Sequence, residues 1–200
     1  MSVSFPQLGF VRKNLVFSLL IFFGYLLEVC AVPYLKIFGV SPNLLYVIIA
    51  VITVAYGKLR AFWAGMVFGL LMQVMLPSVS YLNLALYSLT ALFCSFPFAD
   101  KALKTIEYER ATNRTRQELP PWMRTLLCAF MNILIYEAIN VAYIYLGDEA
   151  LTSDHIERAM LDILLTVLLT ALLMFPLRRL IFGRRDAPVM RPSPVLFSRR

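Results

Sequence analysis

Two long apolar runs on either side of a short basic turn constrain the fold of this chain most strongly. The runs are Leu44–Tyr56 and Ala61–Leu76, and the turn between them is Gly57–Arg60. Each run makes about 20–24 Å of α-helix at 1.5 Å per residue. That length nearly crosses a hydrocarbon core of about 30 Å, and the flanking residues supply the remainder. Residues Ser41–Pro77 are therefore predicted to form a transmembrane helical hairpin with its turn in the cytoplasm.

The composition is that of an integral membrane protein rather than of a soluble domain. Apolar residues make up 60% of the chain and charged residues only 16%, whereas soluble domains are about 25% charged. The net charge of +7 does not indicate a nucleic-acid partner. The basic residues lie at the ends of apolar runs, not in a continuous stripe interleaved with aromatic side chains.

Further apolar runs predict an all-α integral membrane protein with a six-transmembrane-helix bundle. The expected spans lie at about residues 15–34, 42–57, 61–77, 81–99, 124–146 and 159–181, in a single membrane domain over residues 1–182. Residues 100–121 alternate acidic and basic side chains, which predicts a solvated cytoplasmic segment. Residues 183–200 are basic and rich in proline, so this tail is expected to be disordered.

The basic residues also predict the orientation. With the N-terminus inside, 17 of the 19 Lys and Arg residues fall in cytoplasmic segments, and only Lys36 and Arg158 fall outside. Positive residues are retained on the cytoplasmic side of a membrane, so both termini are expected in the cytoplasm. The basic pairs Arg178–Arg179 and Arg184–Arg185 are expected to attract anionic lipids, by about 1 kcal/mol per charge.

The sequence gives little support for catalysis, and no cofactor is expected. Cys30, Cys94 and Cys128 lie within or beside apolar runs without metal-ligand spacing, so they are interpreted as packing residues. His155 has no partner at helical spacing and is a poor candidate for a metal ligand. The chain lacks a phosphate-binding glycine loop, a nucleophile elbow and a pair of carboxylates on one helix face. It is therefore predicted not to be an enzyme.

Polar side chains inside the predicted spans are better candidates for function, because charged groups at such depth cost roughly 2–4 kcal/mol and usually face protein or water. The fifth span places several of them in one sector, and Asp162 opens a polar face on the sixth. Hydrogen bonds between the two helices, a small-molecule pocket and a contact with another membrane protein are the three interpretations. The candidates are Glu28, Asn132, Tyr136, Glu137, Asn140 and Asp162.

Gly65 and Gly69 form a G-x-x-x-G pair, which lets another backbone approach closely. Packing within the same bundle is favoured over a partner interface. Gln73 stands one helical turn further on and is grouped with the glycines as a helix-packing or partner-interface residue.

Several of these features, in this order, resemble the rod shape-determining protein MreD family. They are Glu28, the run Ser41-Pro42-Asn43-Leu44-Leu45, Ala55-Tyr56-Gly57, Gly65 and Gly69-Leu70-Leu71. The resemblance covers roughly residues 14–182. One departure is Gln73, which stands where members of the family commonly carry an acidic residue, although an amide still forms hydrogen bonds.

The resemblance implies a bacterial inner-membrane adaptor of the cell-elongation complex, which patterns lateral-wall peptidoglycan. The implied partners are an MreC-like single-span protein with a large external domain, and in a larger complex MreB, RodA and its transpeptidase. It also implies a six-helix fold similar to the substrate-binding subunits of energy-coupling-factor transporters.

That similarity supplies the alternative function, a vitamin-binding transport subunit. Such a subunit needs a convergent polar pocket near the outer surface, which Glu28 and the loop Asp148–Glu157 could line. Against this alternative, the first span lacks the run of small alanines with which those subunits contact their energising partner, and carries Ser18, Phe22 and Tyr25 there instead.

Overall fold

The computed structural model describes residues 6–75, 81–99, 119–147 and 152–182, and the chain is all-helical in these ranges apart from turns and one isolated bridge. The helices are α1 (Pro6–Cys30), α2 (Leu44–Tyr56), α3 (Lys58–Met75), α4 (Leu82–Phe98), α6 (Pro121–Leu146) and α7 (Ser153–Phe182), with a short 3₁₀ turn η1 (Val32–Tyr34). Most of the expected cytoplasmic segment 100–121 and the whole tail 183–200 lie outside the described residues.

The central helix is α2, the shortest of the six. Every residue from Leu44 to Val54 is buried, because α1, α3, α4, α6 and α7 all pack against it. A helix that is apolar on all sides must be covered on all sides, and here protein supplies most of the cover. The uniformly apolar run Leu44–Tyr56 thus forms the core of the bundle.

Three helical segments are long and apolar enough to cross a membrane, namely Asn14–Tyr34, Pro121–Leu146 and Ser153–Ile181. The helices α2 and α4 are apolar but only 13 and 17 residues long. A helix of 13 residues is about 20 Å long, which is well short of a hydrocarbon core of about 30 Å. Among the residues that the structure describes, three helices are thus long and apolar enough for a membrane span, where six spans were expected for the chain.

Several helix boundaries differ from the predicted spans. The basic turn shrinks to Gly57, whose φ of +85° reverses the chain in one residue, so Lys58–Arg60 forms the first turn of α3. The last helix begins at Ser153, six residues before the predicted start. Asp154 in its first turn suits a helix N-terminus, where the backbone dipole favours negative charge.

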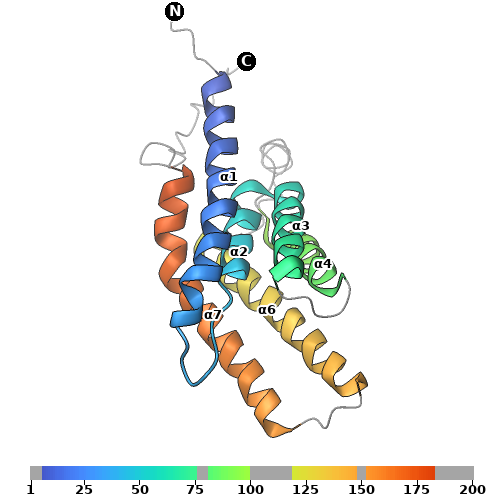
Figure 1. Cartoon of the computed structure of the whole chain (residues 1–200). Helices are drawn as coiled ribbons and strands as arrows, with labels where there is room; N and C mark the ends of the chain where they lie inside the picture. The colour runs from blue at the N-terminus through green and yellow to red at the C-terminus, as the bar shows by residue number, and fades with distance from the viewer. Residues whose placement is uncertain (1–5, 76–80, 100–118, 148–151, 183–200) are drawn as a thin grey trace, which may run out of the picture.

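Different segments lie at the two ends of the bundle (Figure 1). The start of α1 and the end of α7 lie at the upper end in this view. The α1–α2 connection, the end of α6 and the start of α7 lie at the lower end. The α1–α2 connection closes with a tight turn at Phe38 and Gly39, where both residues have positive φ.

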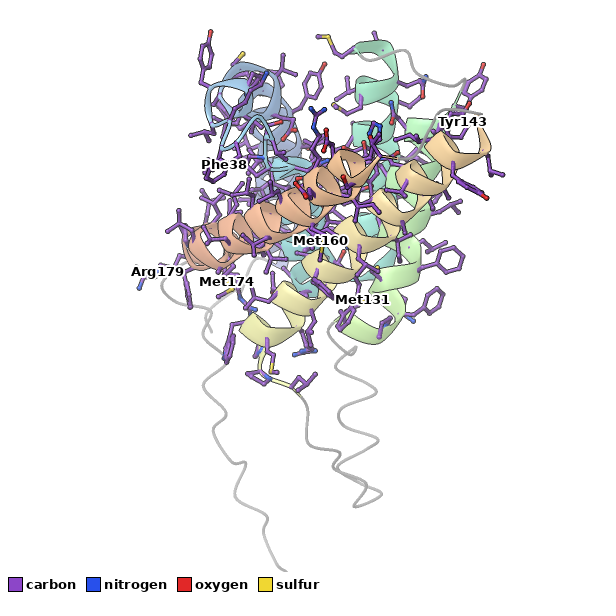
Figure 2. All side chains as sticks on the ribbon, turned by 90° about the horizontal axis from the view of Figure 1, so that it is seen from below. Phe38, Met131, Tyr143, Met160, Met174 and Arg179 are labelled. Carbon is purple, nitrogen blue, oxygen red and sulfur yellow. The ribbon has the colours of Figure 1, made fainter. Side chains whose placement is uncertain are left out.

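The outer faces of α6 and α7 are apolar. Met131 on α6 and Met160 on α7 point away from the bundle (Figure 2). On α7 the exposed face continues through Leu164, Leu168 and Leu172, spaced one helical turn apart. Such a face suits lipid or another helix, as a membrane location requires.

Candidate functional site

The N-terminus of α2 is buried among polar side chains from other helices. Glu28 of α1 accepts a hydrogen bond from the Leu44 backbone N–H at 2.9 Å. Thr166 of α7 accepts one through its hydroxyl from the Asn43 backbone N–H at 3.0 Å. Asn43 is the N-cap residue, and its side-chain oxygen accepts from the Tyr46 N–H at 3.4 Å. The first N–H groups of a helix have no intrahelical partner, so these side chains satisfy groups that burial would leave unpaired.

Asn43 also joins this junction to α4. Its amide nitrogen donates to the Tyr87 hydroxyl at 2.8 Å. Tyr87 in turn stacks on Tyr46, with ring centroids 4.6 Å apart and planes within 8°. Tyr136 of α6 packs against both rings at 5.3 and 5.7 Å. Three helices thus meet at one aromatic cluster beneath the capped end of α2.

Thr166 extends the polar contacts toward the surface. The same hydroxyl that accepts from Asn43 donates to the Asp162 carboxylate at 3.0 Å. Because a hydroxyl can accept and donate at once, the helix end, the threonine and the carboxylate form a chain. We call Glu28, Asn43, Tyr87, Asp162 and Thr166 the buried polar junction.

A pocket of about 550 Å³ opens beside the buried polar junction. We call it the outer pocket. Figure 2 shows nitrogen and oxygen atoms gathered beside the first turns of α7, with Tyr143 near the end of α6. The outer pocket is lined by the α1–α2 connection, the start of α4, the end of α6 and the start of α7. The polar and charged lining residues are Ser41, Asn83, Tyr136, Glu137, Asn140, Tyr143, His155, Arg158 and Asp162.

Two carboxyl groups contact each other in the outer pocket. Glu137 of α6 and Asp162 of α7 lie within hydrogen-bonding reach of one another, and the Asn140 amide contacts Glu137. Both acidic residues are only partly accessible to solvent. Arg158 and His155 line the rim. A hydrogen bond between two carboxyl groups requires a proton on one of them, so the pair carries one net negative charge.

The structure brings together most of the predicted polar residues, but not all. Tyr136, Glu137, Asn140 and Asp162 line the outer pocket. Asn132 was expected to share this polar face, yet it is fully buried and donates to the Cys128 carbonyl of its own helix at 2.8 Å. An asparagine that bonds one turn back along its helix contributes no hydrogen bond across the interface.

Glu28 does not line the outer pocket, contrary to the possibility raised for a transport subunit. Its carboxylate accepts a hydrogen bond from the Leu44 N–H at the N-terminus of α2. Glu28 also borders a separate cavity of about 280 Å³ beside Met72 and Met75. His155 from the predicted outer loop does reach the outer pocket, whereas residues 148–151 of that loop lie outside the described residues.

The glycine pair lies where α3 meets α4. A Cβ atom on Gly65 would overlap the Tyr87 carbonyl oxygen, and one on Gly69 would stand 2.8 Å from the Leu84 Cα. Both glycines therefore allow close approach to the backbone of a helix in the same chain, as the favoured packing interpretation expected.

Gln73 caps the neighbouring helix. Its side-chain oxygen accepts from the Asn83 backbone N–H at 3.2 Å, near the start of α4. A carboxylate would accept there too, and the helix dipole would favour its charge. Either a glutamine or an acidic residue at position 73 can therefore accept the hydrogen bond from the start of α4.

Replacing Gly65 or Gly69 by alanine or leucine is expected to destabilise the protein. Overpacking against a backbone that cannot rotate away costs on the order of 1–3 kcal/mol. Gly24→Ala is the matched control, since a Cβ there meets mainly the Ile48 side-chain end, which can change rotamer. Thermal unfolding in mild detergent measures all variants. Equal unfolding temperatures for the Gly65, Gly69 and Gly24 alanine variants would contradict the packing shown at α4.

The sequence patterns did not identify three residues at the centre of this region, namely Asn43, Tyr46 and Tyr87. Asn43 carried a recognisable signal, because an asparagine directly before an apolar run is a typical N-cap. Tyr46 and Tyr87 carried none, since a tyrosine in an apolar helix suits the membrane interface as well as the core.

Comparisons with known proteins add no relative: no family model, no curated protein and no solved structure matches this chain.

Proposed function

We propose that this chain is a non-enzymatic adaptor of the MreD type in the bacterial inner membrane, which helps pattern lateral-wall peptidoglycan by holding an MreC-like partner. The observation that supports it best is the position of the residues that carry the resemblance. Glu28 and the Asn43–Leu44 pair meet at the buried end of α2, and Gly65 and Gly69 form the contact with α4. The motif residues therefore build the bundle itself.

In this proposal the bundle crosses the membrane six times with both termini in the cytoplasm. The positions of the basic residues support this orientation. The bundle can hold short helices because α2 faces other helices on all sides, so lipid thickness does not set its length. The outer pocket then opens on the non-cytoplasmic side, at the end that carries the α1–α2 connection.

An adaptor of this kind acts through helix contacts. The connection between α1 and α2, residues 31–43, holds only η1 and one tight turn, which offers little surface for a wall enzyme or for peptidoglycan. The exposed faces of α1, α6 and α7 are apolar. Within a bilayer, association relies on van der Waals packing and on hydrogen bonds between helices. The partner would contribute the external domain that this chain does not supply in its described part.

Depleting the chain in its own rod-shaped bacterium is expected to turn rods into spheres, since loss of the adaptor leaves lateral-wall synthesis without its organiser. Wild-type protein should restore rods. The Gly65→Leu variant should not, if its folded amount falls. Unchanged rods after depletion below the detection limit of an immunoblot would refute the cell-elongation role.

The outer pocket favours a second candidate, the substrate-binding subunit of a vitamin transporter. Its volume of about 550 Å³ lies within the range of about 300–1,000 Å³ typical of small-molecule sites. That subunit would be recovered with an ATPase-linked membrane partner rather than with wall-synthesis proteins.

A further inference from the structure

The carboxyl pair of the outer pocket, Glu137 and Asp162, is held by a shared proton and by neutral donors. Three carboxyl groups, those of Glu28, Glu137 and Asp162, lie around the N-terminus of α2. The Glu28 carboxylate interacts directly with the partial positive charge at the N-terminus of α2, because it accepts the hydrogen bond from the Leu44 N–H. Asp162 reaches the helix end only through the Thr166 hydroxyl. Glu137 has no link to it.

Within the described part of the chain, no cation neutralises the one charge that the pair of Glu137 and Asp162 retains. Neither Glu137 nor Asp162 forms an ion pair with a described Lys or Arg, and their contacts are each other, Asn140 and Thr166. Arg158 lies on the rim, one helical turn before Asp162, but is exposed. Two carboxylates at this range do not both ionise unless a positive group stands between them. A bound cation can therefore take the place of the shared proton, which leaves to solvent.

The rest of the pocket suits the carbon part of a ligand. Tyr136 lies next to Glu137 on α6, and Val141, Tyr143 and Ile144 continue the wall toward the rim. The lining thus offers apolar and aromatic side chains beside the carboxyl pair, which an organic ligand with one charged end can contact.

We propose that the outer pocket binds an organic cation, with an ammonium or guanidinium group between Glu137 and Asp162 and its apolar part along Tyr136 and Ile144. Each carboxylate accepts a charge-assisted hydrogen bond from the cation. The Asn140 amide contacts Glu137 and orients it. This binding does not depend on the adaptor role, because every contact lies within this chain.

Phenethylammonium is a suitable probe, and phenethyl alcohol is its neutral counterpart of equal size. Titration of the full-length protein in mild detergent, followed by ligand-observed NMR, is expected to show saturable binding of the amine. The alcohol should bind at least tenfold more weakly, because it lacks the charge that the carboxylates complement. Equal binding of amine and alcohol would overturn the proposal.

Variants locate the site. Glu137→Gln and Asp162→Asn keep the shape but remove one charge each, and each should weaken amine binding about tenfold or more. Glu157→Gln is the matched control, since Glu157 is exposed on α7 and does not line the pocket. Arg158→Gln should tighten binding, because it removes a competing positive charge from the rim. If Asp162→Asn fails to fold, Glu137→Gln still decides. Amine affinity unchanged in Glu137→Gln overturns the proposal.

The natural cation is either a free amine or a basic side chain of a partner protein. Purification of wild type and Glu137→Gln from native membranes separates the two sources. Loss of a small-molecule mass in the variant identifies a free amine, whereas loss of a protein partner identifies a basic side chain. Identical small molecules and partners in both preparations would overturn the assignment of a natural cation to this pocket.

Discussion

Asn43→Leu is expected to destabilise the protein strongly, because Asn43 makes two separate hydrogen bonds at the buried polar junction. The substitution removes the cap of α2, which is worth about 0.5–2 kcal/mol. It also leaves the buried Tyr87 hydroxyl without the amide that donates to it, at about 1–3 kcal/mol for an unsatisfied buried group. The two losses together predict a fall of about 1.5–5 kcal/mol in the free energy of unfolding.

Two companion variants separate these contributions. Asn43→Ser keeps a side-chain oxygen for the cap but is too short to reach Tyr87 as the amide does, so it should recover part of the loss. Tyr87→Phe removes the hydroxyl alone and leaves the Asn43 amide without that acceptor. Unfolding in mixed detergent micelles measures all three. A cost below about 1 kcal/mol for Asn43→Leu would mean that the capped end of α2 is not a determinant of stability.

The helical class of this fold followed from the sequence, but the place of each helix within it did not. Long apolar runs with few charges predict membrane helices directly. They do not show whether a run faces lipid or protein, because both are equally apolar. For that reason the sequence predicted Leu44–Tyr56 as half of a membrane hairpin but did not show that other helices bury it from Leu44 to Val54.

The polar site was predictable in its parts but not in its geometry. The helical period placed Tyr136, Glu137 and Asn140 near one another, and Asp162 joined them as expected across the α6–α7 interface. Asn132 belongs to the same predicted sector but is fully buried and lies outside the pocket lining, because periodicity gives the side of a helix and not the depth in the bundle. The pocket lies at the end of α6, beside the start of α7 and the α1–α2 connection.

Glu28 illustrates the same limit. Its position in an apolar run marked it as a residue that faces protein or water. Nothing local indicated that its partner would be the backbone of Leu44, at the start of another helix. A contact with a backbone N–H leaves no signal in side-chain pattern, so only the fold identifies it.

Recovery of a partner from native membranes is expected to separate the two proposed functions completely. An adaptor whose own described connections are short turns must hold a protein that has an external domain, through contacts within the bilayer. A transport subunit needs no such protein and instead requires an ATPase-linked partner together with its small ligand. The two functions therefore predict different masses in one experiment.

Native mass spectrometry of the chain, purified in mild detergent from its own bacterium, is the most direct test of the adaptor role. The expected result is a complex with an MreC-like single-span protein, and its loss in a variant with an overpacked α3–α4 contact such as Gly69→Leu. An amine bound in the outer pocket is compatible with that result. Recovery of a vitamin-sized ligand and an ATPase-linked membrane protein, without any wall-synthesis partner, would contradict the adaptor role.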